Sequence, residues 1–150
     1  MIRDLEAKDA EACDAILAGL PDWFGDPVGI TECAEALRSQ AGYVATDGAG
    51  AVAGFLTWVS TTPDTAEITW MAVRSDERHR GIGRALIDAL IERLHVDDVG
   101  SLLVKTLSDR SPDASYAQTR AFYRSLGFEP VAELDIWGPD NPAQLLMRSL

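Results

Sequence analysis

The chain has 150 residues, of which 47% are apolar and 25% are charged, a composition typical of one globular domain with a single core. Its formal net charge of −11 argues against nucleic acid as a partner, because phosphates are bound by Lys and Arg; an acidic surface would instead draw cationic small molecules or basic peptides. No apolar run reaches the roughly 20 residues of a membrane span, and the first residues lack a secretory signal pattern, so we expect a cytoplasmic protein with one domain, residues 1–150.

Two helices are expected near the beginning of the sequence, after a short strand at residues 2–5. Asp9 can cap the first helix, and Gly19 lies where that helix should end. The second helix is expected at 31–40. An aromatic loop at 20–27 separates the two helices.

Three strands follow, and the last of them leads into a basic turn. The strands are expected at 43–46, 52–59 and 66–73. The four residues between the first two strands, Asp-Gly-Ala-Gly at 47–50, are typical of a hairpin because glycine accepts a positive φ. The third strand ends just before the cationic segment 78–84.

The second half of the sequence indicates strand-helix-strand units. Leucine and isoleucine at helical spacing predict a helix from residue 82 to about residue 95, and a further helix is expected at 116–126 with Gly127 as its left-handed stop. The strands of this half are expected at 101–107, 128–137 and 143–148. The order of elements predicts an α/β sandwich with a mixed, mostly antiparallel central sheet of about six to seven strands, flanked by about four helices.

Neither a disulfide framework nor a metal site is expected. Cys13 and Cys33 stand apart with no second pair, so the sequence predicts two reduced and buried thiols. His79 and His95 lack the spacing and the neighbouring carboxylates of a metal site.

The segment Arg78-His79-Arg80-Gly81-Ile82-Gly83-Arg84 reverses the sign of the charge locally. A helix expected to begin at about Ile82 presents unpaired N–H groups there, which suits a phosphate. Gly81 and Gly83 let a pyrophosphate approach the backbone, and the three arginines can neutralise it. The segment is neither a P-loop nor a dinucleotide-binding loop, because it lacks Gly-Lys-Ser/Thr and has Leu86 where a small residue is needed. A basic loop with a glycine-assisted helix start is the ordinary alternative.

Two motifs in order carry a resemblance to a known family. Arg78-x-x-Gly81-x-Gly83, entered from the strand Met71-Ala72-Val73, is similar to the acetyl-CoA pyrophosphate loop of the GNAT superfamily of N-acetyltransferases. The later segment 119–128, Thr-Arg-Ala-Phe-Tyr-Arg-Ser-Leu-Gly-Phe, resembles the second signature of that family. The order and lengths of the elements match over essentially the whole chain. The resemblance implies a GNAT-like fold and direct transfer of acetyl from acetyl-CoA to a primary amine, with both substrates bound together.

The resemblance also implies which residues bind acetyl-CoA. The Val73 N–H would bond the thioester carbonyl, and the N–H groups of the basic turn would hold the pyrophosphate. The complete set implied for acetyl-CoA is Met71, Ala72, Val73, Arg78, His79, Arg80, Gly81, Ile82, Gly83, Arg84, Phe122 and Tyr123.

Two residues are implied to act in catalysis. Tyr123 matches the family position whose hydroxyl protonates the departing CoA thiolate; the alternative is a core tyrosine beside Phe122 and Phe128. Glu67 would accept the proton of the amine through an ordered water; the alternative is an ordinary strand carboxylate that faces solvent.

The acceptor is less well determined by the sequence. Trp23, Phe24, Trp70 and Trp137 are candidate walls of its site, although large aromatic side chains more often fill cores. The acidic composition favours a small cationic amine, such as a polyamine or an aminoglycoside. A protein or peptide acetyltransferase and a non-catalytic acyl-CoA sensor are the alternatives, and a homodimer is compatible with the resemblance.

Overall fold

The structure is a computed structural model that describes residues 1–20, 27–111 and 115–150. Its centre is a seven-stranded sheet of order β1-β2-β3-β4-β5-β7-β6, in which only the β4–β5 pair is parallel. The strands are β1 (Ile2–Asp4), β2 (Ala41–Thr46), β3 (Val52–Thr62), β4 (Thr65–Val73), β5 (Ser101–Leu107), β6 (Glu129–Leu134) and β7 (Ala143–Ser149). The expected mixed and mostly antiparallel sheet is therefore confirmed.

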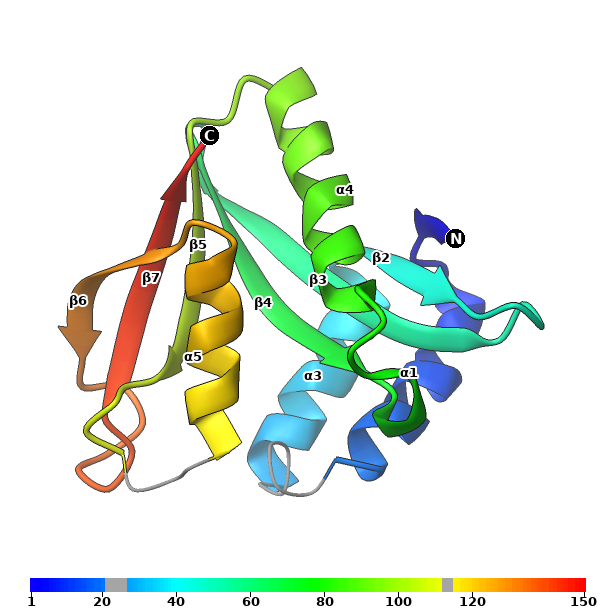
Figure 1. Cartoon of the computed structure of the whole chain (residues 1–150), viewed down its shortest axis with the longest axis horizontal. Coiled ribbons are helices and arrows are strands. Elements are labelled where there is room, and N and C mark those ends of the chain that lie inside the picture. The colour runs from blue at the N-terminus through cyan, green and yellow to red at the C-terminus, as the bar shows by residue number, and fades with distance from the viewer. Residues whose placement is uncertain (21–26, 112–114) are drawn as a thin grey trace.

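The described residues form four α-helices, which cover both faces of the sheet (Figure 1). They are α1 (Ala10–Ala18), α3 (Pro27–Ser39), α4 (Ile82–Val96) and α5 (Ser115–Ser125). Short 3-10 turns at Ala7–Asp9 and Ser75–Glu77 precede α1 and α4. No helix in the described part of the chain is both long and apolar enough to cross a membrane.

The alternation of side chains along each strand divides the core into two layers. Leu56 of β3 packs with the apolar stripes of α4 and α5 on one face, whereas its neighbour Phe55 packs with α1 and α3 on the other. Cys13 and Cys33 are free thiols buried in this second layer, as the sequence predicts. Burial raises the pKa of both thiols to about 12, so both stay protonated at neutral pH.

Several local predictions are confirmed by the backbone. In the β2–β3 hairpin the Asp47 carboxylate accepts the N–H groups of Ala49 and Ala51, and Gly50 has φ 84°. After α5, Gly127 has φ 89°, which is the left-handed stop expected there.

Other boundaries differ from the sequence prediction. The second helix begins at Pro27 and not at Thr31, because proline is favourable in the first turn of a helix. The strand expected at 128–137 ends at Leu134, which pairs with Ala143, the first residue of β7; residues beyond Leu134 have no partner strand. Strands β2, β3 and β4 are each longer than predicted.

The expected helix cap at Asp9 is also wrong, because its carboxylate has other partners. The Asp9 side chain makes no capping hydrogen bond to α1. It accepts two hydrogen bonds of 2.8 Å from the Arg3 guanidinium and one from the Glu6 N–H. The residue is only 4% exposed, so this ion pair ties β1 to the start of α1.

Asp9 should make the stability of the protein depend on pH. The hydrogen bonds from Arg3 hold the pKa of Asp9 below its ordinary value. The ionised carboxylate therefore stabilises the fold above the unfolded pKa of about 3.9, and this contribution is lost as pH falls through the lower folded pKa. We expect Asp9→Asn to cost about 1–3 kcal/mol at pH 7 in urea unfolding, with a smaller cost below pH 3. Asp14→Asn, which removes an exposed ion pair with Arg38, is the control; equal losses at both pH values would contradict the prediction.

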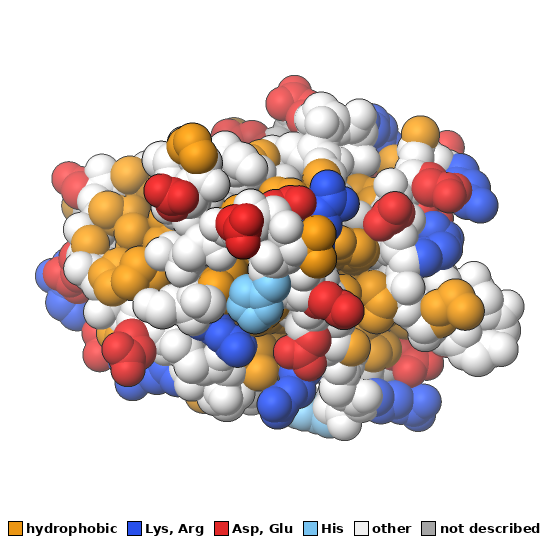
Figure 2. Space-filling model, turned by 90° about the horizontal axis from the view of Figure 1, so that it is seen from above, with side chains coloured by type: hydrophobic (Ala, Val, Ile, Leu, Met, Phe, Trp, Pro, Cys, Tyr) orange, Lys and Arg blue, Asp and Glu red, His pale blue; other side chains and the backbone are white. Residues whose placement is uncertain are grey.

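Acidic residues are spread over the surface and mixed with cations. On the face shown in Figure 2, Asp and Glu side chains alternate with Lys, Arg and apolar side chains. The negative net charge therefore does not form one continuous patch on that face.

Candidate functional site

The sheet opens between β4 and β5. The two strands pair only over Thr65–Ile68 and Ser101–Val104, and beyond these residues they diverge (Figure 1). Thr57 pairs with Trp70 and Trp58 pairs with Ile68, so β4 carries an extra residue at the point where the strands separate, which is a bulge. The opening belongs to a cavity of about 1520 Å³, larger than an ordinary ligand site of roughly 300–1,000 Å³.

The end of β4 presents backbone N–H groups to this opening. Hydrogen-bonded and non-bonded pairs alternate along an antiparallel ladder. Because the Arg74 N–H donates to the Ala53 oxygen at 2.7 Å, the next pair, Gly54 and Val73, is of the non-bonded kind. The Val73 N–H therefore points away from β3, toward the gap that β5 leaves open.

The basic turn after β4 is held on one side by ion pairs and is open to an anion on the other. Arg74 binds the carboxylates of Asp47, Asp76 and Glu77, which holds the Ser75–Glu77 turn against the β2–β3 hairpin. Gly81 then directly precedes α4, with φ 78° and no side-chain cap, and an added Cβ there would meet nothing within 4 Å. The N–H groups of the first helical turn are thus accessible to an anion.

The cavity brings together nearly all of the residues predicted for acetyl-CoA. Arg80 alone among them does not line it; its guanidinium lies 3.3 Å from Glu77 and its side chain is 68% exposed. Gly83 lies against Phe122, because an added Cβ would be 3.1 Å from the Phe122 ring. The turn and α5 therefore form one continuous wall.

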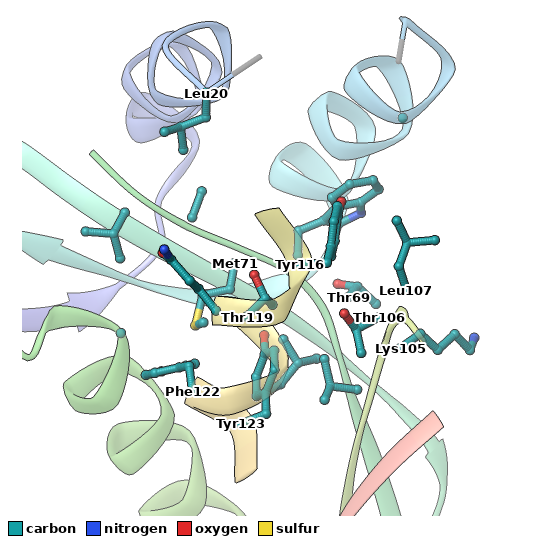
Figure 3. A pocket seen from close by; sticks show the side chains of 18 of the residues that line it. Leu20, Thr69, Met71, Lys105, Thr106, Leu107, Tyr116, Thr119, Phe122 and Tyr123 are labelled. Atoms are coloured by element: carbon teal, nitrogen blue, oxygen red, sulfur yellow. The ribbon is translucent and has the colours of Figure 1, made fainter. Parts of the chain in front are cut away.

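Tyr123 belongs both to the core and to the cavity wall. It is 5% exposed on α5, and its ring meets the rings of Phe122 and Phe128 edge-on at 5.3 and 5.4 Å. It also lines the cavity, as Figure 3 shows. Burial raises its pKa above the ordinary value, so the phenol keeps its proton through the neutral range. Its position therefore suits both a core tyrosine and the expected proton donor to the CoA thiolate.

Glu67 is not an ordinary carboxylate facing solvent. Its side chain is 15% exposed and one oxygen lies 3.2 Å from the Lys105 ammonium of β5. This ion pair joins the two strands beside their separation, and both residues line the cavity. Any amine or water that reaches this oxygen must share it with Lys105.

Three threonine hydroxyls near the opening were missed by sequence reasoning. The Thr69 hydroxyl donates to the Gln40 side chain and lies 2.8 Å from the Thr57 hydroxyl. The buried Thr106 hydroxyl has no hydrogen-bond partner within the described part of the chain. Figure 3 shows Thr69 and Thr106 on the walls formed by β4 and β5. An isolated threonine in a strand has no motif that would have identified it.

Of the aromatic residues predicted for the acceptor site, Trp70 and Trp137 line the cavity. Trp23 and Phe24 lie outside the described residues. Among the described residues, no cluster of three or more His, Cys, Asp or Glu side chains could hold a metal ion.

Comparison with known proteins gives a family match over most of the chain. Residues 38–130 match the family model for the acetyltransferase (GNAT) domain, a range that includes β4, the basic turn, α4, β5 and α5. No curated protein matches the sequence.

Solved structures share the fold at low sequence identity. A protein of Desulfovibrio desulfuricans assigned to the GNAT family of acetyltransferases has a TM-score of 0.87 at 20% identity, over 99% of this chain and 98% of its own. The ribosomal-protein-S18-alanine N-acetyltransferase of Escherichia coli has a TM-score of 0.79 at 23% identity, over 99% and 92%. An aminoglycoside 6'-N-acetyltransferase in complex with coenzyme A has a TM-score of 0.76 at 16% identity, over 99% and 96%.

Proposed function

The chain belongs to the GNAT family of acetyltransferases, and from this premise we propose that it moves acetyl from acetyl-CoA directly to a primary amine, with both substrates bound together. The observation that carries the proposal is the continuous cavity that runs from the glycine-opened start of α4, along the unpaired part of β4, to Tyr123 and Glu67. The acceptor is proposed to be a small amine that is cationic in solution.

The donor half of the cavity fits acetyl-CoA by charge and shape. The pyrophosphate would lie on the N–H groups that follow Gly81, where the α4 dipole and the exposed Arg84 favour an anion. Gly81 and Gly83 carry no side chain that would fill this cradle. The pantetheine arm would then follow the edge of β4 that β5 leaves open, which brings the thioester toward Val73.

The chemistry follows from the groups at the inner end of the cavity. The Val73 N–H would stabilise the oxyanion that develops on the thioester carbonyl, an effect of about 3 kcal/mol for one such donor. Tyr123 would donate to the departing thiolate. With ordinary pKa values near 10 and 8.5, complete proton transfer is uphill by about 2 kcal/mol, and burial raises the pKa of Tyr123 further. We therefore propose a shared hydrogen bond during C–S cleavage.

Glu67 is proposed to receive the amine proton, directly or through water. At pH 7 the neutral form of an amine with a pKa of about 10.4 costs about 4.6 kcal/mol. We expect Glu67→Gln to lower kcat/KM by about tenfold to a hundredfold at pH 7. The loss should shrink as pH rises toward 10, because the neutral amine then forms in solution. Rates of thiol release measured from pH 6.5 to pH 10 test this. Glu32→Gln, another carboxylate lining the cavity, is the control, and a loss that does not vary with pH would contradict the role.

The function itself is tested by thiol release from acetyl-CoA against polyamines, aminoglycosides, amino acids and lysine peptides. Amine-dependent release with a small amine supports the proposal. Release with peptides alone would favour a protein acetyltransferase. Binding of CoA without release in the presence of any amine would favour an acyl-CoA sensor.

A further inference from the structure

The cavity is apolar at one mouth and polar at its floor. In the described part of the chain seven large apolar side chains are exposed, and three of them line this cavity: Val28, Ile136 and Trp137, at 63%, 50% and 43% exposure. Val28 lies in the first turn of α3, whereas Ile136 and Trp137 lie in the connection between β6 and β7. We name these three residues the apolar mouth.

Ile136 and Trp137 of the apolar mouth lie apart from the basic turn. The β6–β7 connection is joined to the end of β5, because the Ser108 N–H donates to the Pro142 oxygen at 2.8 Å and Leu107 pairs with Ala143. The basic turn instead follows β4, on the other side of the gap. The end of β5 diverges from the end of β4 (Figure 1). The acetyl donor and the β6–β7 part of the apolar mouth, Ile136 and Trp137, therefore use different sides of one cavity.

The charges that line the cavity do not suit a polycation. Its described lining contains three carboxylates, Glu32, Glu67 and Glu77. Glu67 is paired with Lys105, and Glu77 with Arg74 and Arg80. Only Glu32 has no ion-pair partner among the described residues, so these carboxylates leave one uncompensated negative charge. A polyamine or an aminoglycoside carries several positive charges. Binding here would place these charges beside an apolar surface that offers them no ion-pair partner.

An exposed apolar surface beside a polar floor fits an amphipathic ligand. The floor offers the Glu67–Lys105 pair and the hydroxyls of Thr69 and Thr106, which can bind an amino group. The mouth offers an indole and two aliphatic side chains, whose contact with an apolar body would be favourable. From this arrangement we infer that the acceptor is a primary monoamine with an apolar body, aryl or long alkyl. Ile136 and Trp137 then determine its selection over polyamines. The inference rests on the proposed function, because it assigns an occupant to the acceptor side of the same cavity.

The first test compares amines at equal concentrations of their neutral form. With thiol release as the assay, kcat/KM for 2-phenylethylamine and hexylamine should exceed that for spermidine by at least about tenfold. A higher kcat/KM for spermidine, or release with peptides alone, would overturn the inference.

A matched pair of variants tests whether the apolar mouth selects the amine. Ile136→Ser should raise KM for 2-phenylethylamine severalfold and leave KM for acetyl-CoA unchanged. Val131→Ser is the control, because Val131 is also 50% exposed but lies on β6 outside the cavity. Trp137→Ala should act in the same direction as Ile136→Ser. Equal effects of the two serine substitutions would contradict a role for the apolar mouth.

A binding measurement separates this inference from the proposed function. Calorimetric titration of 2-phenylethylamine and of spermidine into the protein saturated with CoA requires no acetyl transfer. Tighter binding of the monoamine, weakened in Ile136→Ser, supports the inference even if no amine releases thiol. If thiol release occurs but the monoamine binds no tighter than spermidine, the proposed function stands and the inference fails.

Discussion

Replacing Tyr123 with phenylalanine is expected to lower kcat by about a hundredfold, while KM for acetyl-CoA and the unfolding midpoint stay close to those of the wild type. The substitution removes only the hydroxyl, and the ring keeps its edge contacts with Phe122 and Phe128. If the hydroxyl donates to the departing thiolate, its loss affects the transition state and not the binding of acetyl-CoA. Steady-state thiol release and thermal unfolding measure the two effects separately.

Tyr116→Phe is the matched control, because Tyr116 lines the same cavity from the same helix. We expect it to retain most of the activity. The wild type should also show no fall in rate from ionisation of Tyr123 up to pH 10, since burial raises the pKa of that phenol. A Tyr123→Phe enzyme with undiminished kcat would leave the residue as a core tyrosine only.

The sequence predicted the elements whose cause is local. Leucine and isoleucine recur at helical spacing from residue 82, and the structure has α4 there with Leu86, Leu90 and Leu94 buried. The glycines at positions 50 and 127 adopt the positive φ that their turns require. These features depend on neighbours within one or two turns of chain, so a single sequence is enough to find them.

The features that were missed depend on contacts between different elements of the fold. The Lys105–Glu67 ion pair exists because β4 and β5 run parallel, and no local pattern indicates which strands become neighbours. Asp9 has the residue type of a helix cap, but Arg3 competes successfully for its carboxylate. The end of β6 is set by where β7 begins. Boundaries and charge pairs of this kind follow from tertiary packing.

The basic turn could be found in the sequence because the function proposed for it requires a local composition. Two glycines, three arginines and a helix start lie within seven residues, and each serves the same end when an anion binds there. The acceptor side has no such pattern. Its apolar mouth combines the start of α3 with the β6–β7 connection, which lie far apart in the sequence. The residues proposed to bind the donor could therefore be named from the sequence, whereas the acceptor could be proposed only as an amine.

Gly83→Trp is expected to raise the dissociation constant of CoA by at least about a hundredfold, which corresponds to about 2.7 kcal/mol. The Phe122 ring lies 3.1 Å from the position of the new Cβ, so the indole must either enter the pyrophosphate cradle or displace Phe122, which also lines the cavity. The fold should survive, because glycine is a poorer helix former than tryptophan. Calorimetric titration with CoA measures the affinity, and circular dichroism checks the fold.

Two further variants decide whether the loss arises at the anion site. Gly48→Trp adds the same indole at an exposed hairpin glycine, where a Cβ would meet nothing within 4 Å, and it should bind CoA like the wild type. Arg84→Glu leaves the Gly83–Phe122 contact intact and reverses an exposed charge in the first turn of α4. We expect it to weaken CoA binding about tenfold at low salt and less at high salt, because an exposed charge is screened. Unchanged affinity in both Gly83→Trp and Arg84→Glu would mean that the pyrophosphate does not bind at this turn.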